Sequence, residues 1–145
     1  MYKHIIIPTD GSVTAMIAVK KGLEFARSIN AKVTALSVHE PYHVFALKYD
    51  VLAESEDAHN KSVRAKAQKN LDAVIVKAKK MKVVCSPMIV ASDEPYEAII
   101  ETAKKEKCDL IAMSSHGRTG LTALVVESQT QKILTHSTIP VLVYR

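Results

Sequence analysis

The chain has 145 residues, the length of one ordinary domain. Hydrophobic residues make up 48% and charged residues 24%, the balance of a globular protein that buries its own core. No apolar run is long enough for a transmembrane helix, and the N-terminus lacks the long apolar stretch and cleavage site of a signal peptide. The composition therefore predicts a single cytoplasmic domain over residues 1–145, with no membrane partner.

The chain is basic, because 20 Lys and Arg residues against 15 Asp and Glu residues give a net charge of +5. A basic surplus is one sign of a nucleic-acid partner. The lysines are nevertheless scattered, no arginine-rich arm is present, and five Tyr and two Phe residues offer few surfaces on which bases stack. The densest group of lysines, in 77–82, lies where a helix is predicted to end, and the helix dipole favours cations there. We therefore predict no nucleic-acid partner.

The two cysteines, Cys85 and Cys108, lie far apart and form no CxxC motif. Such cysteines are typical of reduced, buried thiols in a cytosolic protein. His39 and His43 have the four-residue spacing of zinc ligands on a helix, but Pro41 between them breaks that helix. The sequence therefore predicts neither a disulfide nor a metal site.

Segments typical of strands alternate with segments typical of helices along the chain. Residues 4–8, HIIIP, are a short apolar run rich in Ile, as expected of a buried parallel strand. Ser12 is a favoured N-cap for a helix that runs to about residue 29 and ends at Asn30. A second strand follows over 33–38. The connection 41–54 has no clear period and is the best candidate for a mobile or partner-contacting segment.

The second half continues the alternation. Its predicted elements are, in chain order, a helix over 55–81, a strand over 83–90, a helix opened by Asp93 and Pro95, a strand over 109–113, a loop over 114–126, a short helix over 128–134 and a last strand over 139–144. Pro87 favours an edge position for the third strand. Five strands separated by helices predict an α/β fold with a parallel, doubly wound sheet and helices on both faces.

Ligands of such sheets bind beyond the carboxyl ends of the strands, where the strand order reverses. The segment PTDGS, residues 8–12, follows the first strand and offers a carboxylate, two hydroxyls and a glycine before a helix. The segment SSHGRTG, residues 114–120, follows the fourth strand and adds hydroxyls and a guanidinium group. Residues 128–130, SQT, are predicted to open a helix whose free N–H groups attract anions. Together these groups suit a sugar and a phosphate chain.

The opening HIIIPTDGS, the segment DLIAMSSHGRTG and the ending QKILTHSTIPVLVYR resemble the universal stress proteins, over essentially the whole chain. The resemblance implies a five-stranded, Rossmann-like fold, a role in the stress response, and a homodimer that pairs its last strands, here Ile139 to Tyr144. One branch of that family binds ATP through the motif G-x2-G-x9-G-[ST], and another branch lacks both the motif and detectable ATP binding. This sequence matches the motif in part.

The resemblance also implies a set of adenine-nucleotide contacts. Three consecutive residues from the end of the first strand onward lie near the adenosine. Val38 offers its backbone to the adenine, and Met113 lies under the base. Two further segments hold the phosphates. These implied residues are Pro8, Thr9 and Asp10 for the adenosine, His116, Gly117 and Arg118 for the phosphate loop, and Ser128, Gln129 and Thr130 for the phosphates. Of the motif, Gly117 and Ser128 match, whereas Ser114 and Glu127 stand at glycine positions.

Glu127 is the serious departure, because it puts a negative charge beside phosphate. Two unit charges about 4 Å apart repel by about 4 kcal/mol at an effective dielectric constant near 20, which is nearly three decades of affinity. A swing of the side chain into solvent, or Mg²⁺ between the charges, would relieve the repulsion. We also hypothesise that Glu127, ahead of the helix, occupies the anion site itself, so that Glu127→Gly raises ATP affinity and slightly lowers stability.

Each of these residues also has a simpler interpretation. The segment 10–12 is also a plain turn and helix cap, His116 is more typical of a structural loop histidine than of a general base, and Arg118 is equally typical of a phosphate clamp and of a surface residue. Motifs of the forms GxxxxGK[ST], GxGxxG and GxSxG are absent, and no carboxylate cluster suggests a two-metal centre. We therefore predict no catalytic residue.

Three functions remain open. The first is an ATP or AMP sensor, with AMP set apart because fewer phosphates would reach Glu127. The second is a nucleotide-free dimeric interaction module in which Glu127 blocks the phosphate site. The third is a slow ATP hydrolase, for which no residue clearly serves as the base.

Overall fold

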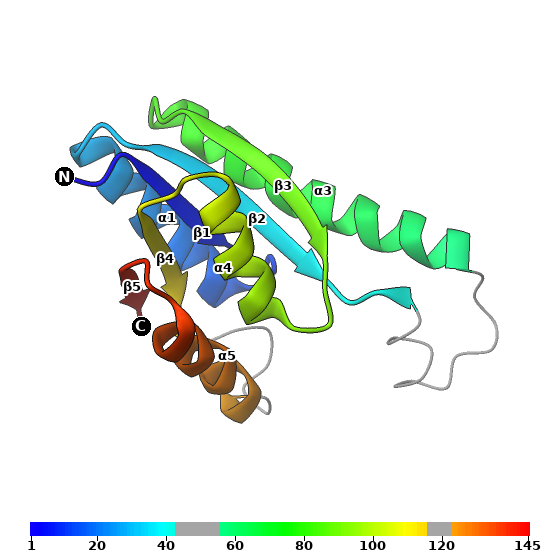
Figure 1. The fold of residues 1–145 in the computed structure, drawn as a ribbon. Helices are drawn as coiled ribbons and strands as arrows, with labels where there is room; N and C mark the ends of the chain where they lie inside the picture. Colours follow the sequence, from blue (N-terminus) through cyan, green and yellow to red (C-terminus); the bar gives the residue numbers. More distant parts are fainter. Residues whose placement is uncertain (43–55, 116–122) are drawn as a thin grey trace.

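The computed structural model describes residues 1–42, 56–115 and 123–145, and over 123–128 it describes the backbone alone. Strands and helices alternate along the chain (Figure 1). The elements are β1 (His4–Pro8), α1 (Val13–Ser28), β2 (Lys32–His39), α3 (Glu56–Lys80), β3 (Cys85–Ala91), α4 (Pro95–Lys105), β4 (Leu110–Ser114), α5 (Ala123–His136) and β5 (Val141–Tyr144).

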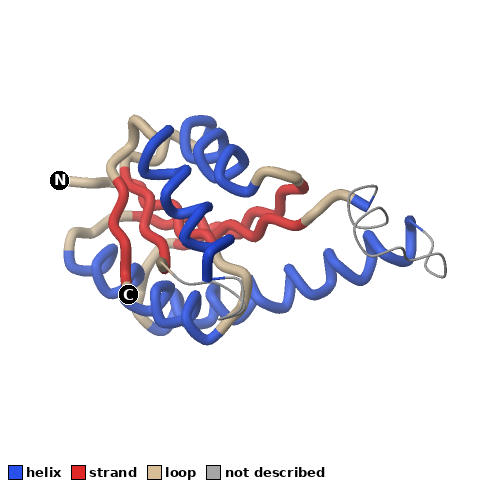
Figure 2. The backbone as a smooth tube through the Cα atoms, turned by 90° about the horizontal axis from the view of Figure 1, so that it is seen from below, coloured by secondary structure: helices blue, strands red, loops and turns tan. Residues whose placement is uncertain are grey.

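The five strands form one parallel sheet in the order β3-β2-β1-β4-β5. The predicted fold class is therefore confirmed, and β3 lies at an edge, where Pro87 predicted it. Figure 2 shows the strands between layers of helices. The α3 helix extends past the ends of β2 and β3 (Figure 1). None of the described helices has the length and apolar character needed to cross a bilayer.

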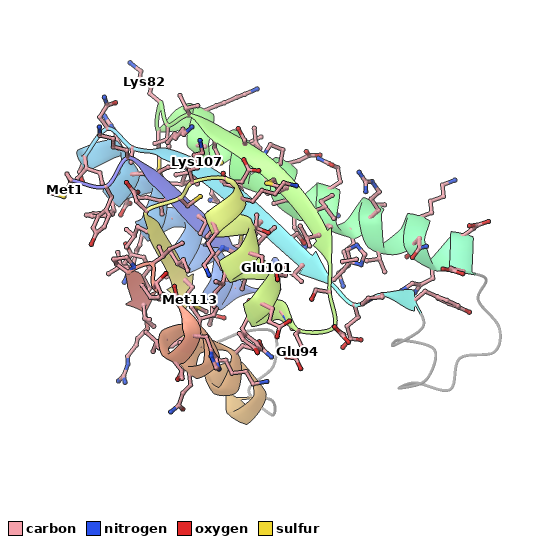
Figure 3. The ribbon with its side chains drawn as sticks, in the orientation of Figure 1. Met1, Lys82, Glu94, Glu101, Lys107 and Met113 are labelled. Carbon is pink, nitrogen blue, oxygen red and sulfur yellow. The ribbon has the colours of Figure 1, made fainter. Side chains whose placement is uncertain are left out.

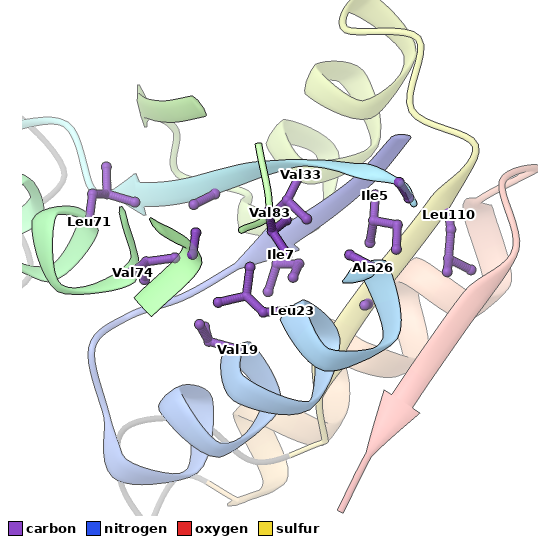
Figure 4. Close-up of a cluster of buried hydrophobic side chains, with 14 residues drawn as sticks. Ile5, Ile7, Val19, Leu23, Ala26, Val33, Leu71, Val74, Val83 and Leu110 are labelled. Atoms are coloured by element: carbon purple, nitrogen blue, oxygen red, sulfur yellow. The ribbon is translucent and has the colours of Figure 1, made fainter. Parts of the chain in front are cut away.

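Two hydrophobic cores lie on opposite faces of the sheet, because successive side chains of a strand point to opposite faces. Ile5 and Ile7 of β1 pack against α1 and α3, in the core shown in Figure 4. Ile6 points the other way and packs with residues of α4 and α5. The run of three isoleucines that predicted a buried strand therefore supplies both cores.

Three helix-to-strand turns share one construction. In each, a residue in the left-handed region follows the helix, and the next residue donates its N–H to a carbonyl near the end of that helix, as in a Schellman motif. The left-handed residues are Asn30, Lys82 and Lys107, at φ 57°, 59° and 57°, and the bonds are Ala31 N to Ala26 O at 2.8 Å, Val83 N to Ala78 O at 2.9 Å and Cys108 N to Ala103 O at 2.8 Å. Asn30 ends α1 as predicted.

Lys82→Gly and Lys107→Gly are each expected to raise the free energy of unfolding by about 0.5–1 kcal/mol. The left-handed conformation costs a residue with a Cβ roughly 1–2 kcal/mol, and the greater freedom of Gly in the unfolded chain returns part of that gain. Urea titration measures the change. Lys104→Gly, within α4, is the control and is expected to lower stability by about 1 kcal/mol. Equal effects in all three variants would contradict the argument.

The start of α5 differs from the prediction. We expected a loop over 114–126 and a helix opened by Ser128, but α5 begins at Ala123. Gly120 is the last helix breaker of this region, and Ala and Leu, which follow at 123 and 124, favour helix. Ser128 is therefore inside the helix. The four free N–H groups belong to its first turn, 123–126.

Smaller differences occur at other ends. β3 begins two residues later than predicted, and β5 begins at Val141 rather than 139. The α4 helix has Glu94 rather than Asp93 at its N-cap, followed by Pro95 in the first turn, where proline suits a helix. Cys85 is half-buried and Cys108 is buried; both are free thiols, and burial raises the pKa of each to about 11.

His4 is buried at the start of β1, where its Nε2 lies 2.8 Å from Thr34 Oγ1. Burial, and then the charge of Lys32, lower the pKa of His4 below its usual 6.5. The folded state therefore favours the neutral ring and binds fewer protons than the unfolded state does.

The free energy of unfolding of the wild type is accordingly expected to decrease as the pH falls below 6.5, where the unfolded histidine takes up a proton. His4→Gln is expected to show a smaller decrease between pH 6.5 and 5, because it removes this proton uptake. Urea titrations of both proteins across that range measure the difference. Parallel pH profiles of the two proteins would show that His4 does not contribute.

Candidate functional site

The order of the strands reverses between β1 and β4. From β1 the chain adds β2 and β3 on one side, then returns to add β4 and β5 on the other. Because all five strands are parallel, the residues that follow β1 and β4 lie at the same edge of the sheet. Thr9 and Ser115 therefore begin the two segments that border this reversal point, as the sequence predicts.

The turn after β1 is held by its own hydrogen bonds. Thr9 is buried, and its N–H donates to Leu36 O at 2.9 Å, while its Oγ1 accepts from Gly11 N at 3.2 Å.

Asp10 Oδ1 accepts from Ser12 N at 2.9 Å, and Ser12 Oγ caps α1 by accepting from Ala15 N at 3.2 Å. The predicted cap is therefore confirmed, and the same turn holds Asp10 half-exposed at the reversal point. Pro8, the last residue of β1, is also half-exposed.

Val38 and Met113 lie near the ends of β2 and β4. Val38 pairs with Val90 in the sheet, and its side chain packs against the core under α4 and α5. Met113 belongs to that core and is only 7% exposed (Figure 3). Both residues lie at the edge of the sheet where the resemblance implies the base, and their predicted contacts with a base stay predictions.

A cavity of about 510 Å³ opens beside Ser114, on the α1 side of the sheet. Its lining residues come from α1, from the end of β4 and from the end of β5, and are Thr14, Ile17, Ala18, Ser114, Ser115, Tyr144 and Arg145. Of these only Ser114 was a predicted site residue. Ser115 belongs to the segment 114–120 that the sequence singles out. The remaining lining residues were missed because they come from segments that are distant along the chain.

Gln129 makes a contact that the sequence did not predict. Its Oε1 accepts a hydrogen bond from Tyr96 N at 3.0 Å. Glu94 makes no side-chain cap bond and Pro95 has no N–H, so Gln129 of α5 satisfies an N–H group at the start of α4. Lys132, one turn further on, lies 3.4 Å from Glu94 Oε2. The amide oxygen of Gln129 therefore links α5 to α4, and the expected phosphate contact stays a prediction.

Thr130 points into the protein. It is 7% exposed and precedes the fully buried Ile133 by one turn. Its Oγ1 is buried and has no hydrogen-bond partner among the residues that the structure describes. Leaving a buried hydroxyl unpaired costs about 1–3 kcal/mol. A ligand oxygen at this position would remove that cost, and the ligand contact of Thr130 stays a prediction.

The other predicted phosphate contacts lie beyond what the structure describes. His116, Gly117 and Arg118 fall outside the described residues, and Glu127 and Ser128 are described by their backbone alone. The hypothesis that Glu127 precedes its helix is wrong, since Glu127 is the fifth residue of α5. It does not lie ahead of the free N–H groups of the first turn.

Within the described residues, no three His, Cys, Asp or Glu side chains gather as metal ligands would. The described part of the reversal point offers a carboxylate on a turn held by hydrogen bonds, hydroxyl groups and, beside Ser114, a cavity. This is the chemistry of a polar small-molecule site.

The sequence was compared with known proteins and solved structures. It matches the Universal stress protein family over residues 1–145. It is 29% identical to universal stress protein MJ0531 of Methanocaldococcus jannaschii, with 100% of this chain and 83% of the relative covered. The solved structure of protein MJ0577 from the same organism has a TM-score of 0.81 at 29% identity, and the match covers 99% of this chain and 95% of that one.

A solved member of the family from Burkholderia pseudomallei shows the same fold, with a TM-score of 0.78 at 22% identity over 99% of this chain and 96% of that one. The family match spans the chain from end to end, and the fold agrees with that of the solved structures. The chain belongs to the Universal stress protein family.

Proposed function

We propose that this protein binds an adenine nucleotide at the reversal point of its sheet. The observation that carries the proposal is the buried hydroxyl of Thr130 on α5, which has no partner among the described residues, together with the turn that holds Asp10 after β1. In this arrangement Asp10 contacts the adenosine, because a carboxylate accepts hydrogen bonds from ribose hydroxyls or the adenine amino group. Thr130 donates to a phosphate oxygen.

Relatives of known structure support this class of ligand. One solved universal stress protein is in complex with cAMP, one from Archaeoglobus fulgidus is in complex with dAMP, and one from Arabidopsis thaliana has AMP bound. All three ligands contain one adenine and one phosphate group.

A single phosphate also suits this chain better than three. Glu127 stands at a glycine position of the ATP motif, where its negative charge would repel further phosphates. We therefore propose AMP as the preferred ligand, with ATP bound more weakly and aided by Mg²⁺, which screens the carboxylate from the phosphates.

Titration calorimetry with AMP, and with ATP in the presence and absence of Mg²⁺, tests the proposal. Saturable binding of AMP is expected, with GMP as the control for base recognition. Asp10→Ala is expected to weaken AMP binding by about tenfold or more, since a charge-assisted hydrogen bond contributes about 1.5–3 kcal/mol. Absence of saturable binding up to millimolar AMP would favour the nucleotide-free interaction module, for which Ser114 and Glu127 are the favouring features.

We propose a regulatory role in the stress response, in the cytoplasm, without catalysis. Phosphate release from Mg-ATP that depends on Asp10 or His116 would overturn the non-catalytic part and favour a slow hydrolase.

The homodimer is also proposed. The outer edge of β5 has no neighbouring strand in the described sheet, and such an edge is a ready template for pairing. Sedimentation at twice the chain mass of 15.9 kDa would support pairing, and a monomer at micromolar concentration would contradict it.

A further inference from the structure

The turn that carries Asp10 is in contact with α3, a helix that supplied no predicted site residue. Gly11 has φ +78°, the left-handed region that glycine adopts without strain. A Cβ added to Gly11 would lie 2.5 Å from Cγ, Nδ2 and Oδ1 of Asn70. The carboxamide of Asn70 therefore lies directly over the Gly11 Cα, in the space that any other residue would fill.

Asn70 also binds this turn. Its Nδ2 donates a hydrogen bond to the backbone carbonyl of Asp10, with a nitrogen-to-oxygen distance of 3.3 Å. The two residues are 60 positions apart in the sequence. Asn70 thus contacts the peptide unit between Asp10 and Gly11 from two sides, by a hydrogen bond to its oxygen and by van der Waals contact with the Gly11 Cα.

The position of Asn70 is fixed by the residues around it. The next residue, Leu71, is fully buried in the core between α3 and the sheet, and Val74 is buried there one turn later. The α3 helix packs against β2 and β3, and also contacts α1. Asn70 itself is half-buried. Because its helix is held by this packing, Asn70 offers the turn a contact that does not depend on the hydrogen bonds within the turn.

We infer that Asn70 is a positioning residue for the nucleotide site, which acts by holding the Asp10–Gly11 peptide so that the Asp10 carboxylate faces the adenosine. The inference rests on the proposed function. Without the Asn70 amide, the Asp10 carbonyl loses a donor and the glycine peptide gains room to rotate, because Gly permits conformations that other residues do not. The carboxylate then has more orientations to lose on binding, and affinity falls.

A double-mutant cycle measured by AMP titration tests this inference. Asn70→Ala is expected to weaken AMP binding about five- to tenfold in the wild-type background and less than twofold in the Asp10→Ala background, since the effect passes through Asp10. Asn70→Asp, which keeps the shape but replaces the donor with an acceptor that repels the Asp10 carbonyl, is expected to weaken binding at least as much. Gln68→Ala is the matched control, because Gln68 is an exposed amide on the same helix that bonds only to Asp72 among the described residues.

The cycle separates positioning from simple destabilisation. A merely structural role would lower the melting temperature and weaken AMP binding by the same factor in both backgrounds, and that outcome would overturn the inference. Unchanged AMP affinity in both Asn70 variants would also overturn it, while the proposed function would stand because the wild type binds. If the wild type itself does not bind AMP, the proposed function and the inference fall together.

Discussion

Replacing Glu127 with Gln is expected to strengthen ATP binding by one to nearly three orders of magnitude and to change AMP binding less than twofold. The repulsion between the carboxylate and a phosphate about 4 Å away is about 4 kcal/mol at an effective dielectric constant near 20. Each factor of ten in affinity corresponds to about 1.4 kcal/mol. AMP has no β- or γ-phosphate, so in the proposed arrangement it does not meet this charge.

The position of Glu127 inside α5 decides which variant to use. A glycine in the interior of a helix costs about 1 kcal/mol, whereas Gln and Glu have similar helix propensities. Glu127→Gln therefore removes the charge and leaves the helix intact, while Glu127→Gly would change both at once.

The measurement is a calorimetric titration with ATP in excess EDTA, repeated with Mg²⁺. The gain is expected to be largest without the metal ion, because Mg²⁺ shields the carboxylate of the wild type. Glu101→Gln, an exposed carboxylate on α4, controls for the change in net charge. Equal ATP affinity in the Glu127 variant and the wild type would show that the carboxylate does not approach the phosphates.

Leu23→Ala is expected to lower the free energy of unfolding by about 3–5 kcal/mol, the cost typical of a leucine truncated in a tight core. Leu23 is 0% exposed and packs with Ile7 and Val19 between α1 and the sheet (Figure 4). A whole domain is stable by only about 5–15 kcal/mol, so this single change removes a large part of the total.

Leu134→Ala is the matched control, because it makes the same substitution in a helix at a residue that is 54% exposed. It is expected to cost less than 1 kcal/mol. Urea titration of both variants measures the contrast. Comparable losses in the two would mean that the α1 core relaxes to fill the cavity, contrary to the close packing described.

The strands and the sheet class were predictable because their signals are local. Three consecutive isoleucines, Ile5 to Ile7, indicate a strand buried on both faces, and Ser12 and Asn30 mark the two ends of α1 by their own chemistry. The start of α5 was less predictable. Polar residues at 127–130 imitate a helix opening. They compete with Thr122, which stands directly before the true start at Ala123 and is also a residue type favoured at N-caps.

Long-range contacts account for the rest of what was missed. Asn70 shows no feature in the sequence that ties it to Asp10, because the contact depends on how α3 packs across the sheet. Gln129 was predicted to contact phosphate. The sequence does not show that its amide oxygen accepts from Tyr96 N, an N–H group that the N-cap residue Glu94 leaves unsatisfied. The type of a side chain alone does not reveal which of several nearby groups it will bond.

Two adjoining residues of α5, Gln129 and Thr130, contact different parts of the protein. Gln129 holds the first turn of α4, and the next residue, Thr130, presents the buried hydroxyl. A shift of the α5 backbone large enough to move Thr130 must therefore carry α4 with it or release the Tyr96 amide. Glu97 and Glu101 lie on the exposed side of the same α4 helix. Gln129 is therefore one of the contacts, beside that of Lys132 with Glu94, through which a movement of α5 would reach α4.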